Sequence, residues 1–282
     1  MIKSLRRFAL AGMLLLAASG YSQDKNFYIF LCLGQSNMEG FPGIPDEDKR
    51  WDNPRFQVLA AVDFPELNRT SGNWYTAIPP LCRPNSGLCP ADYFGRTMVA
   101  RLPASIRIGV VNVSVGGCKI ELFDKRTNLA YISAAPAWMK SAISAYGGNP
   151  YQRLVDMGKL AQQAGVIRGI LLHQGESNVN DPEWSAKVKS VYESLLTDLD
   201  LKAEDAPLIA GEVVDQHNAV ASMNAMMSEL PKIIPTAHIV SAAGCGSLPD
   251  HLHFTPEGYR ELGKRYAEAV LPLLEHKQTD AK

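Results

Sequence analysis

Ser36 has a sequence context that suits nucleophilic chemistry. It stands in the segment GQSNM, residues 34–38, directly after the apolar run 27–33. A glycine before the serine lets the chain turn sharply, and a helical turn after it aims backbone N–H groups at an anion. The segment is not the G-x-S-x-G elbow of the α/β-hydrolases. The alternative is a serine that caps an ordinary turn between a strand and a helix.

Asp250 and His253 supply the base that a serine nucleophile needs. They lie three positions apart in the segment DHLHFTP, residues 250–256. At this spacing a carboxylate in a turn can reach back to the imidazole, fix its tautomer and stabilise the imidazolium. One alternative is a capping aspartate beside two surface histidines. Another is a metal site with His251 and His253 as ligands, but no carboxylate-rich motif accompanies them, so we expect no metal.

Two further segments offer hydrogen-bond donors for a developing oxyanion. Gly116 and Gly117 follow the apolar run 106–113, and a glycine pair frees backbone N–H groups to approach a ligand. A plain turn is the alternative there. Gln174 lies in the polar segment HQGESN, residues 173–178, directly after another apolar run. Its amide is of the type that donates to an oxyanion, and a structural loop rarely needs such a density of polar side chains.

The elements that must position these residues follow from the apolar pattern. Runs of strand length alternate with segments of helical spacing, which predicts an α/β fold whose parallel sheet is covered on both faces. Ligands bind such sheets at the carboxyl ends of the strands, where all four segments are expected to lie. The expected strands are 27–33, 56–61, 106–113, 167–173, 208–213 and 238–242, and the expected helices are 92–102, 151–163, 182–201, 218–230 and 256–274.

The composition is that of an ordinary globular protein. Of the 282 residues, 46% are hydrophobic and 20% are charged, with a net charge of −1. These values exclude an intrinsically disordered chain, a coiled coil and a disulfide-dense mini-protein. A near-zero net charge gives no support to a nucleic-acid partner, which usually requires a basic footprint.

Residues 1–22 have the layout of a secretory signal peptide. Lys3, Arg6 and Arg7 precede an eleven-residue run of apolar residues and glycine, residues 8–18, and small and polar residues follow it. This run is too short to span a bilayer, which needs about 20 residues. We expect cleavage after Ser22 or Gly20, a single domain over residues 23–282, no membrane span, and a periplasmic or extracellular location. A short anchor helix or a disordered start is the alternative.

Export matters for the five cysteines, because disulfides form in oxidising compartments. Cys82 and Cys89 lie seven positions apart in a loop-like stretch, so a short loop disulfide is expected there. Cys32, inside an apolar run, is expected to be a buried thiol, while Cys118 and Cys245 either pair or stay free. No cysteine pattern indicates zinc or a cysteine nucleophile.

The four segments together resemble the sequence blocks of the SGNH hydrolase superfamily. GQSNM, the Gly-Gly turn, HQGES and the D-x-x-H pair are most similar to carbohydrate esterase family six, the acetylxylan esterases and sialic-acid-specific acetylesterase relatives. The resemblance runs from about residue 27 to residue 274. It implies a three-layer α/β/α, flavodoxin-like domain with about five parallel strands.

The resemblance also implies roles for individual residues. Ser36 would be the acylated nucleophile, His253 the base and Asp250 its orienting partner. The Ser36 N–H, the Gly117 N–H and the Gln174 amide would form the oxyanion hole, with Gly116 an open alternative to Gly117. Glu176 would be a supporting residue, and since some triads use glutamate, Asp250 and Glu176 both stay open as the triad acid.

The implied function is a secreted serine esterase that removes O-acetyl groups from an acetylated polysaccharide or oligosaccharide without a cofactor. Acetylxylan is favoured over O-acetylated sialic acid, because the chain is short for a sialate esterase. A non-catalytic carbohydrate-binding protein and a metal-dependent hydrolase are the alternatives, and the oligomeric state stays open. The aromatic residues expected in loops, where they would stack on sugar rings, are Trp51, Trp74, Tyr75 and Trp138.

Overall fold

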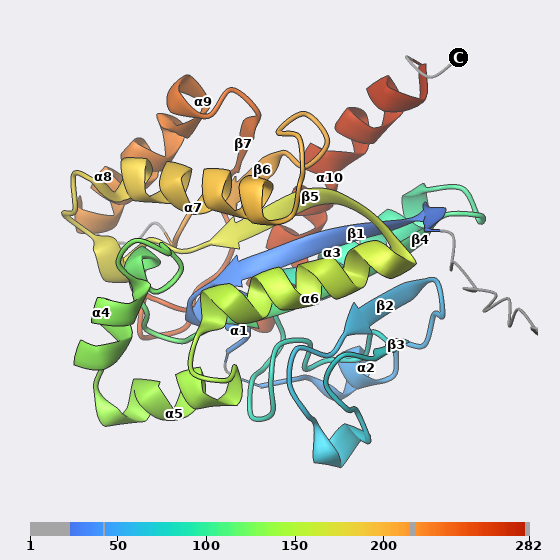
Figure 1. Ribbon diagram of the computed structural model, residues 1–282, viewed down its shortest axis with the longest axis horizontal. Coiled ribbons are helices and arrows are strands. Elements are labelled where there is room, and N and C mark those ends of the chain that lie inside the picture. The colour runs from blue at the N-terminus through green and yellow to red at the C-terminus, as the bar shows by residue number, and fades with distance from the viewer. Residues whose placement is uncertain (1–22, 42, 215–217, 280–282) are drawn as a thin grey trace, which may run out of the picture.

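The computed structural model describes residues 23–41, 43–214 and 218–279, and its centre is a seven-stranded sheet between helices (Figure 1). The strand order is β3-β2-β4-β1-β5-β6-β7. The strands are β1 (Asp24–Gly34), β2 (Phe56–Leu59), β3 (Trp74–Thr76), β4 (Arg107–Ser114), β5 (Gly165–His173), β6 (Leu208–Gly211) and β7 (Ala237–Val240). Paired strands are parallel except β3, which is antiparallel to β2.

The parallel α/β class is therefore confirmed, but the expected number of about five strands is too low. Six of the strands coincide with the six apolar runs, within a few residues at each end. The seventh, β3, has only three residues and lies in a stretch rich in proline, glycine and asparagine. A strand this short has too few alternating positions to be recognised by its pattern.

The ten helices in the described part of the chain range from one turn to 24 residues. They are α1 (Ser36–Glu39), α2 (Asp46–Lys49), α3 (Pro90–Arg101), α4 (Asn128–Ala134), α5 (Ala137–Ala145), α6 (Pro150–Ala164), α7 (Trp184–Asp198), α8 (Asn218–Ser228), α9 (Leu230–Ile233) and α10 (Pro256–Thr279). Short 3-10 turns occur at Pro65–Leu67, Ile120–Leu122 and Glu176–Asn178. The five expected helices correspond to α3, α6, α7, α8 and α10.

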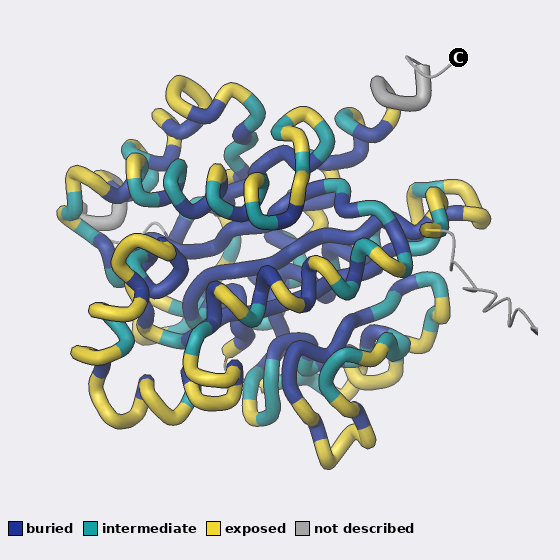
Figure 2. Tube along the Cα trace, in the orientation of Figure 1, coloured by how far each residue is buried: buried dark blue, intermediate teal, exposed yellow. Residues whose placement is uncertain are grey.

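The central strand β1 shows why the sheet is buried on both faces. Its side chains alternate, with Ile29 and Leu31 in one hydrophobic cluster and Phe30 and Cys32 in the other. The first cluster includes apolar residues of α6 and α7, and the second includes those of α3 and α10. Figure 2 shows the buried strands running through the middle of the molecule, with exposed residues on the outer sides of the helices. This is the expected three-layer arrangement.

The expected disulfide between Cys82 and Cys89 is absent from the described residues, since all five cysteines are free thiols. Each of the two thiols has its own buried polar contacts. Cys82 Sγ lies 3.1 Å from the hydroxyl of Tyr146, and Cys89 precedes the first residue of α3, with its Sγ 3.8 Å from the amide of Asn112. The expectation was wrong because the loop-like sequence between the two cysteines does not indicate that both side chains are buried in the core.

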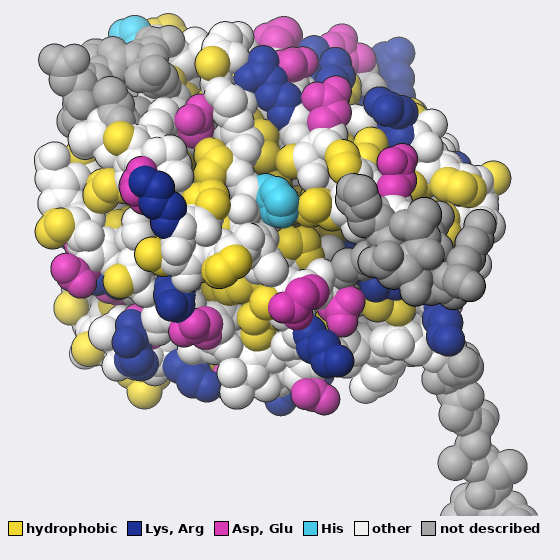
Figure 3. Space-filling view, turned by 90° about the horizontal axis from the view of Figure 1, so that it is seen from above, with side chains coloured by type: hydrophobic (Ala, Val, Ile, Leu, Met, Phe, Trp, Pro, Cys, Tyr) yellow, Lys and Arg dark blue, Asp and Glu magenta, His cyan; other side chains and the backbone are white. Residues whose placement is uncertain are grey.

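The N-terminal segment, residues 1–22, lies outside the described residues, so the expected signal peptide stays a prediction. Among the helices that the structure describes, none combines the length and hydropathy required to cross a bilayer. On the face shown in Figure 3, Lys and Arg side chains are interspersed with Asp and Glu side chains. This mixture agrees with the net charge of −1.

Candidate active site

The register of the sheet places the ends of three neighbouring strands, β4, β1 and β5, beside one another. Gly34, at the end of β1, pairs with Ser114 of β4 on one side and with His173 of β5 on the other. The loops that begin after these three residues therefore emerge side by side at the carboxyl edge of the sheet, where α1 follows β1 (Figure 1). Parallel sheets typically bind ligands at this edge, where connections leave a strand on opposite sides.

The turn that carries Ser36 is held tightly against β5. A Cβ atom on Gly34 would lie 2.0 Å from the carbonyl oxygen of His173, so only glycine fits this close approach. The next amide, that of Gln35, donates to the same carbonyl at 3.1 Å. The buried Asn112 of β4 donates to the Met38 carbonyl at 2.8 Å and holds α1 from the other side. Ser36 is thus the first residue of a short helix fixed by two strands.

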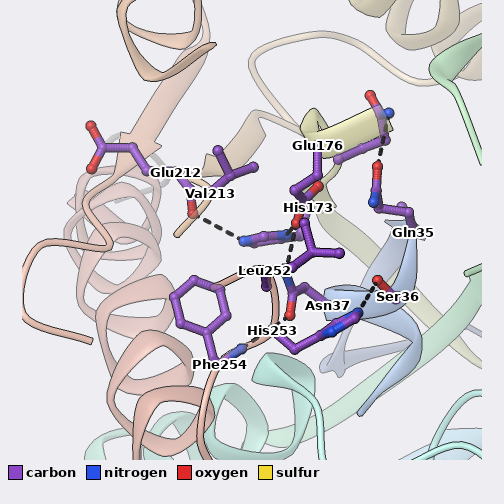
Figure 4. A network of polar contacts seen from close by, with 12 residues as sticks. Gln35, Ser36, Asn37, His173, Glu176, Glu212, Val213, Leu252, His253 and Phe254 are labelled. Atoms are coloured by element: carbon purple, nitrogen blue, oxygen red, sulfur yellow. Dashed lines mark hydrogen bonds and ion pairs between the residues drawn. The ribbon is translucent and has the colours of Figure 1, made fainter. Parts of the chain in front are cut away.

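His253 joins Ser36 and Asp250 in a continuous chain of hydrogen bonds. Its Nε2 lies 2.8 Å from Ser36 Oγ (Figure 4), and its Nδ1 lies 2.7 Å from Asp250 Oδ2. A proton on Nδ1 donates to the carboxylate and leaves Nε2 as an acceptor for the hydroxyl proton. The ring of Phe41 packs on the imidazole with the ring centroids 4.1 Å apart. Both ring nitrogens of His253 are thus engaged, one by Ser36 and the other by Asp250.

Asp250 is kept ionised by the loop around it. Burial by itself would raise the pKa of this carboxyl group, but hydrogen bonds from the His253 ring and from the backbone N–H groups of His253 and Leu252 outweigh it. The pKa of Asp250 falls to about 2. Its Oδ1 accepts from both backbone N–H groups at 3.0 Å. Asp250 therefore stays negatively charged at any pH above about 3 and can stabilise an imidazolium.

Three amides near Ser36 differ in their availability. The Gly116 N–H donates to the carboxylate of the buried Glu39, which also forms an ion pair with Arg83. In the part of the chain that the structure describes, the backbone N–H groups of Ser36 and Gly117 donate to no acceptor. Gly117 has a φ of +68°, a conformation that glycine adopts without strain. Of the two glycines, Gly117 is the one with a free donor.

The Gln174 amide is already hydrogen-bonded to the surrounding loops. It is fully buried, and its Nε2 is within hydrogen-bonding distance of three acceptors: Asn178 Oδ1 at 2.7 Å, Gln35 Oε1 at 3.2 Å and the Cys118 carbonyl at 3.3 Å. Its oxygen accepts from the indole of Trp184 at 2.6 Å. Because the amide has two hydrogens and three acceptors already surround it, it has no donor to spare for an oxyanion.

Glu176, the other candidate for the acid beside His253, hydrogen-bonds to Asn37 and not to the His253 ring. Its Oε1 accepts from Asn37 Nδ2 at 2.6 Å and lies 3.7 Å from His173 Nδ1 (Figure 4). Burial lowers the pKa of His173, although the charge of Glu176 acts in the opposite direction. Of the two candidate acids, Asp250 is the one hydrogen-bonded to the His253 ring. Asn37, which links Glu176 to the His253 loop, was missed by sequence reasoning, although it stands next to Ser36 in GQSNM.

One of the four predicted sugar-stacking aromatics lies at this site. Trp138 is on α5, is 61% exposed, and its ring would meet a Cβ atom on Gly117 at 2.8 Å. Trp74 and Tyr75 belong to strand β3, and Trp51 packs on a guanidinium group. Within the described ranges, no three His, Cys, Asp or Glu residues are grouped as metal ligands.

A family model described as carbohydrate esterase, sialic acid-specific acetylesterase, matches residues 26–272. A solved structure from Arabidopsis thaliana is similar with a TM-score of 0.68 and 23% identity, covering 88% of this chain and 99% of that one. A carbohydrate acetylesterase from Xanthomonas citri has a TM-score of 0.63 and 18% identity, covering 88% of this chain and 57% of that one. NanS has a TM-score of 0.60 and 17% identity, covering 90% and 99%.

At these identities the structural likenesses establish the fold alone. The family match is of a different kind, because it covers nearly the whole sheet and includes both the turn that carries Ser36 and the loop that carries His253. The chain belongs to the carbohydrate esterase family of the sialic acid-specific acetylesterases.

Proposed function

We propose that this protein is a serine esterase that removes O-acetyl groups from carbohydrate through an acyl-enzyme. The observation that carries the proposal is the hydrogen-bonded chain from Ser36 Oγ through His253 to Asp250, at 2.8 and 2.7 Å. A nucleophile, a base and an orienting acid in this order form the general arrangement of serine hydrolases.

In the first half-reaction, His253 Nε2 takes the proton of Ser36 as Oγ forms a bond to the acetyl carbonyl carbon. The negative charge then resides on the former carbonyl oxygen. Collapse of the tetrahedral intermediate breaks the carbon–oxygen bond to the sugar, and the imidazolium returns its proton to the departing sugar oxygen. In the second half-reaction, His253 deprotonates a water molecule that attacks the acetyl-serine, and acetate leaves.

The oxyanion is held by the free backbone N–H groups of Ser36 and Gly117. Both donors belong to the backbone, so they are already in place and need no rearrangement when the charge develops. Gln174 has a structural role in place of a third oxyanion donor, because its amide joins the three loops behind the site.

For the substrate, an acetylated xylan stays the first candidate and an O-acetylated sialic acid the second. Arg83, which packs on the nucleophile turn, is already paired with Glu39, so its charge is offset. This favours a neutral sugar. The description of the family model favours the sialic acid. Comparing acetate release from acetylated xylan with release from O-acetylated sialic acid separates the two.

The direct test of the chemistry is Ser36→Ala. We expect this variant to remain folded and to lose hydrolysis of p-nitrophenyl acetate by at least about 1000-fold, because the acyl-enzyme can no longer form. Circular dichroism and the melting temperature control for folding, and incubation of the unmodified protein with a chelator controls for a metal-dependent reaction. Full activity of Ser36→Ala would overturn the assignment of the nucleophile.

A further inference from the structure

We propose that Asn37 positions the catalytic histidine, and that Glu176 acts on His253 only through Asn37. The inference rests on the proposed function, because it concerns the same nucleophile and base. It assigns a task to the residue that follows Ser36 and gives Glu176 a place outside the triad.

Asn37 holds the backbone on both sides of His253. Its Nδ2 donates to the carbonyl oxygen of Leu252 at 3.0 Å, and its Oδ1 accepts from the N–H of Phe254 at 3.4 Å (Figure 4). These are the residues immediately before and after the base. One side chain therefore fixes the peptide segment from which the imidazole projects.

The orientation of the Asn37 amide is itself fixed. The side chain is fully buried; its Nδ2 also donates to Glu176 Oε1 at 2.6 Å, and its Oδ1 also accepts from the hydroxyl of Tyr259 at 2.7 Å. The Leu252 carbonyl can only accept and the Phe254 N–H can only donate, so these two backbone groups fix which end of the amide faces each of them. Rotating the amide by 180° would leave two or more buried groups unsatisfied, each at a cost of about 1–3 kcal/mol.

Glu176 is built to anchor this amide rather than to assist the base directly. Its side chain is 3% exposed, and among the described residues its Oε2 has no hydrogen-bond partner. Behind it, the ring of His173 uses Nε2 on the Glu212 carbonyl at 3.0 Å and turns Nδ1 towards Glu176 at 3.7 Å. The single strong hydrogen bond of Glu176 thus goes to Asn37, and the route from Glu176 to His253 passes through that amide.

This arrangement ties the nucleophile to the base across a long stretch of chain. Ser36 and Asn37 are neighbours on α1, while the loop they hold lies 217 residues further along the sequence. A displacement of about 1 Å between reacting groups can reduce a rate by about 100-fold. Loss of the Asn37 amide is therefore expected to reduce kcat and to leave KM, which depends on sugar contacts, nearly unchanged.

The test compares Asn37→Ala, Glu176→Ala and Glu176→Gln with the unmodified full chain on an acetylated xylo-oligosaccharide. We expect kcat to fall about 100-fold in Asn37→Ala and at least about 10-fold in Glu176→Ala, with KM changed by less than about threefold. Glu176→Gln keeps an oxygen that accepts from Asn37, so its kcat is expected to stay within about threefold of the unmodified protein.

Asn224 supplies a matched control. Its side chain makes the same kind of two-sided clamp, donating to the Val213 carbonyl at 3.1 Å and accepting from the Val213 N–H at 3.0 Å, at a loop that lacks the base. Asn224→Ala is expected to lower the melting temperature and to retain kcat. If Asn37→Ala fails to fold, the pair of Glu176 variants decides the question.

Two results would overturn the proposal. One is a folded Asn37→Ala, or a Glu176→Ala, with kcat within threefold of the unmodified protein. The other is a Glu176→Gln as impaired as Glu176→Ala, which would mean that the charge of Glu176 acts on the base. Failure of the proposed function is a separate result, since it would appear as Ser36→Ala retaining activity or as an unmodified protein that releases no acetate.

Discussion

Trp138 is the residue through which we expect the site to recognise a sugar ring. Its indole is 61% exposed and lies over Gly117, beside the proposed oxyanion hole. Aromatic rings in contact contribute about 0.5–1.5 kcal/mol beyond the area that they bury, and an apolar sugar face offers a similar partner. Trp138→Ala is therefore expected to reduce kcat/KM for an acetylated xylo-oligosaccharide about 10-fold, with little effect on vinyl acetate, which has no ring.

Leu129 provides the comparison for this substitution. It is 70% exposed on α4, the helix before α5, and Leu129→Ala is expected to leave both substrates unaffected. Kinetics of the two variants on both esters make the measurement. An equal loss on vinyl acetate and on the oligosaccharide would show that Trp138 supports the fold of the site and does not bind the sugar.

The candidate residues differ in how far the sequence could place them. The contact of Ser36, His253 and Asp250 could be predicted because each proposed role requires a particular residue type at a particular kind of turn. Gln174 has the right chemistry for an oxyanion donor, but only coordinates reveal that neighbouring loops already use its amide. Asn37 was missed because its partners are two backbone groups, and backbone groups leave no mark in a sequence.

At the scale of elements, the first turn of α3 contains a buried carboxyl group, that of Asp92. Asp92 is fully buried in the first turn, and its Oδ2 accepts from the Cys89 N–H at 3.0 Å. Burial raises the pKa of Asp92 to about 6, although this hydrogen bond acts in the opposite direction. The folded state therefore binds this proton more tightly than the unfolded state, and the stability associated with Asp92 falls as pH rises from about 4 to about 6.

Asp92→Asn is expected to remove this dependence, because the amide keeps an oxygen for the Cys89 N–H and carries no charge. The free energy of unfolding of the variant minus that of the unmodified protein should be up to about 3 kcal/mol larger at pH 8 than at pH 4. Urea denaturation at both pH values measures it. Asp156→Asn, at an exposed position of α6, should give no such difference. Parallel stability profiles for Asp92→Asn and the unmodified protein would contradict the prediction.

The elements that sequence reasoning missed bury few side chains, in contrast to those that it predicted. The long strand β1 was predicted because it is apolar on both faces and lies at the centre of the sheet. Strand β3, at the edge, has three residues that are each half-buried, so its pattern carries little signal. Helices α4 and α5 bury few side chains, and both Leu129 and Trp138 on them point to solvent. Their apolar spacing is therefore not that of a core helix.

At the scale of the whole molecule, the layers and six of the seven strands could be read from the sequence, whereas the edge strand β3 could not. Two hydrophobic clusters, one on each face of the sheet, follow directly from continuous apolar strands that alternate with amphipathic helices. The family resemblance implied about five strands and the apolar runs predicted six; the three-residue strand β3 at one edge brings the number to seven. The proposed triad lies at the ends of the central strands and in the loop before α10, so predicting it did not depend on the edges of the sheet.

At the scale of the whole molecule, the free thiols contrast with the export that the predicted signal peptide implies, because disulfides form in oxidising compartments. All five cysteines are free, and four of them are completely buried on separate polar contacts or apolar neighbours. Burial raises the pKa of each of these four thiols, which suppresses the reactive thiolate. We expect a thiol reagent to count five thiols in guanidinium chloride, at most one in the native protein, and the same melting temperature with and without dithiothreitol. A count of three in the denatured protein would reveal a disulfide.

A second measurement tests the predicted signal peptide. If material recovered from outside the cytoplasm has the intact mass of a chain that starts at Gln23 and carries five free thiols, residues 1–22 are removed and the thiols survive export.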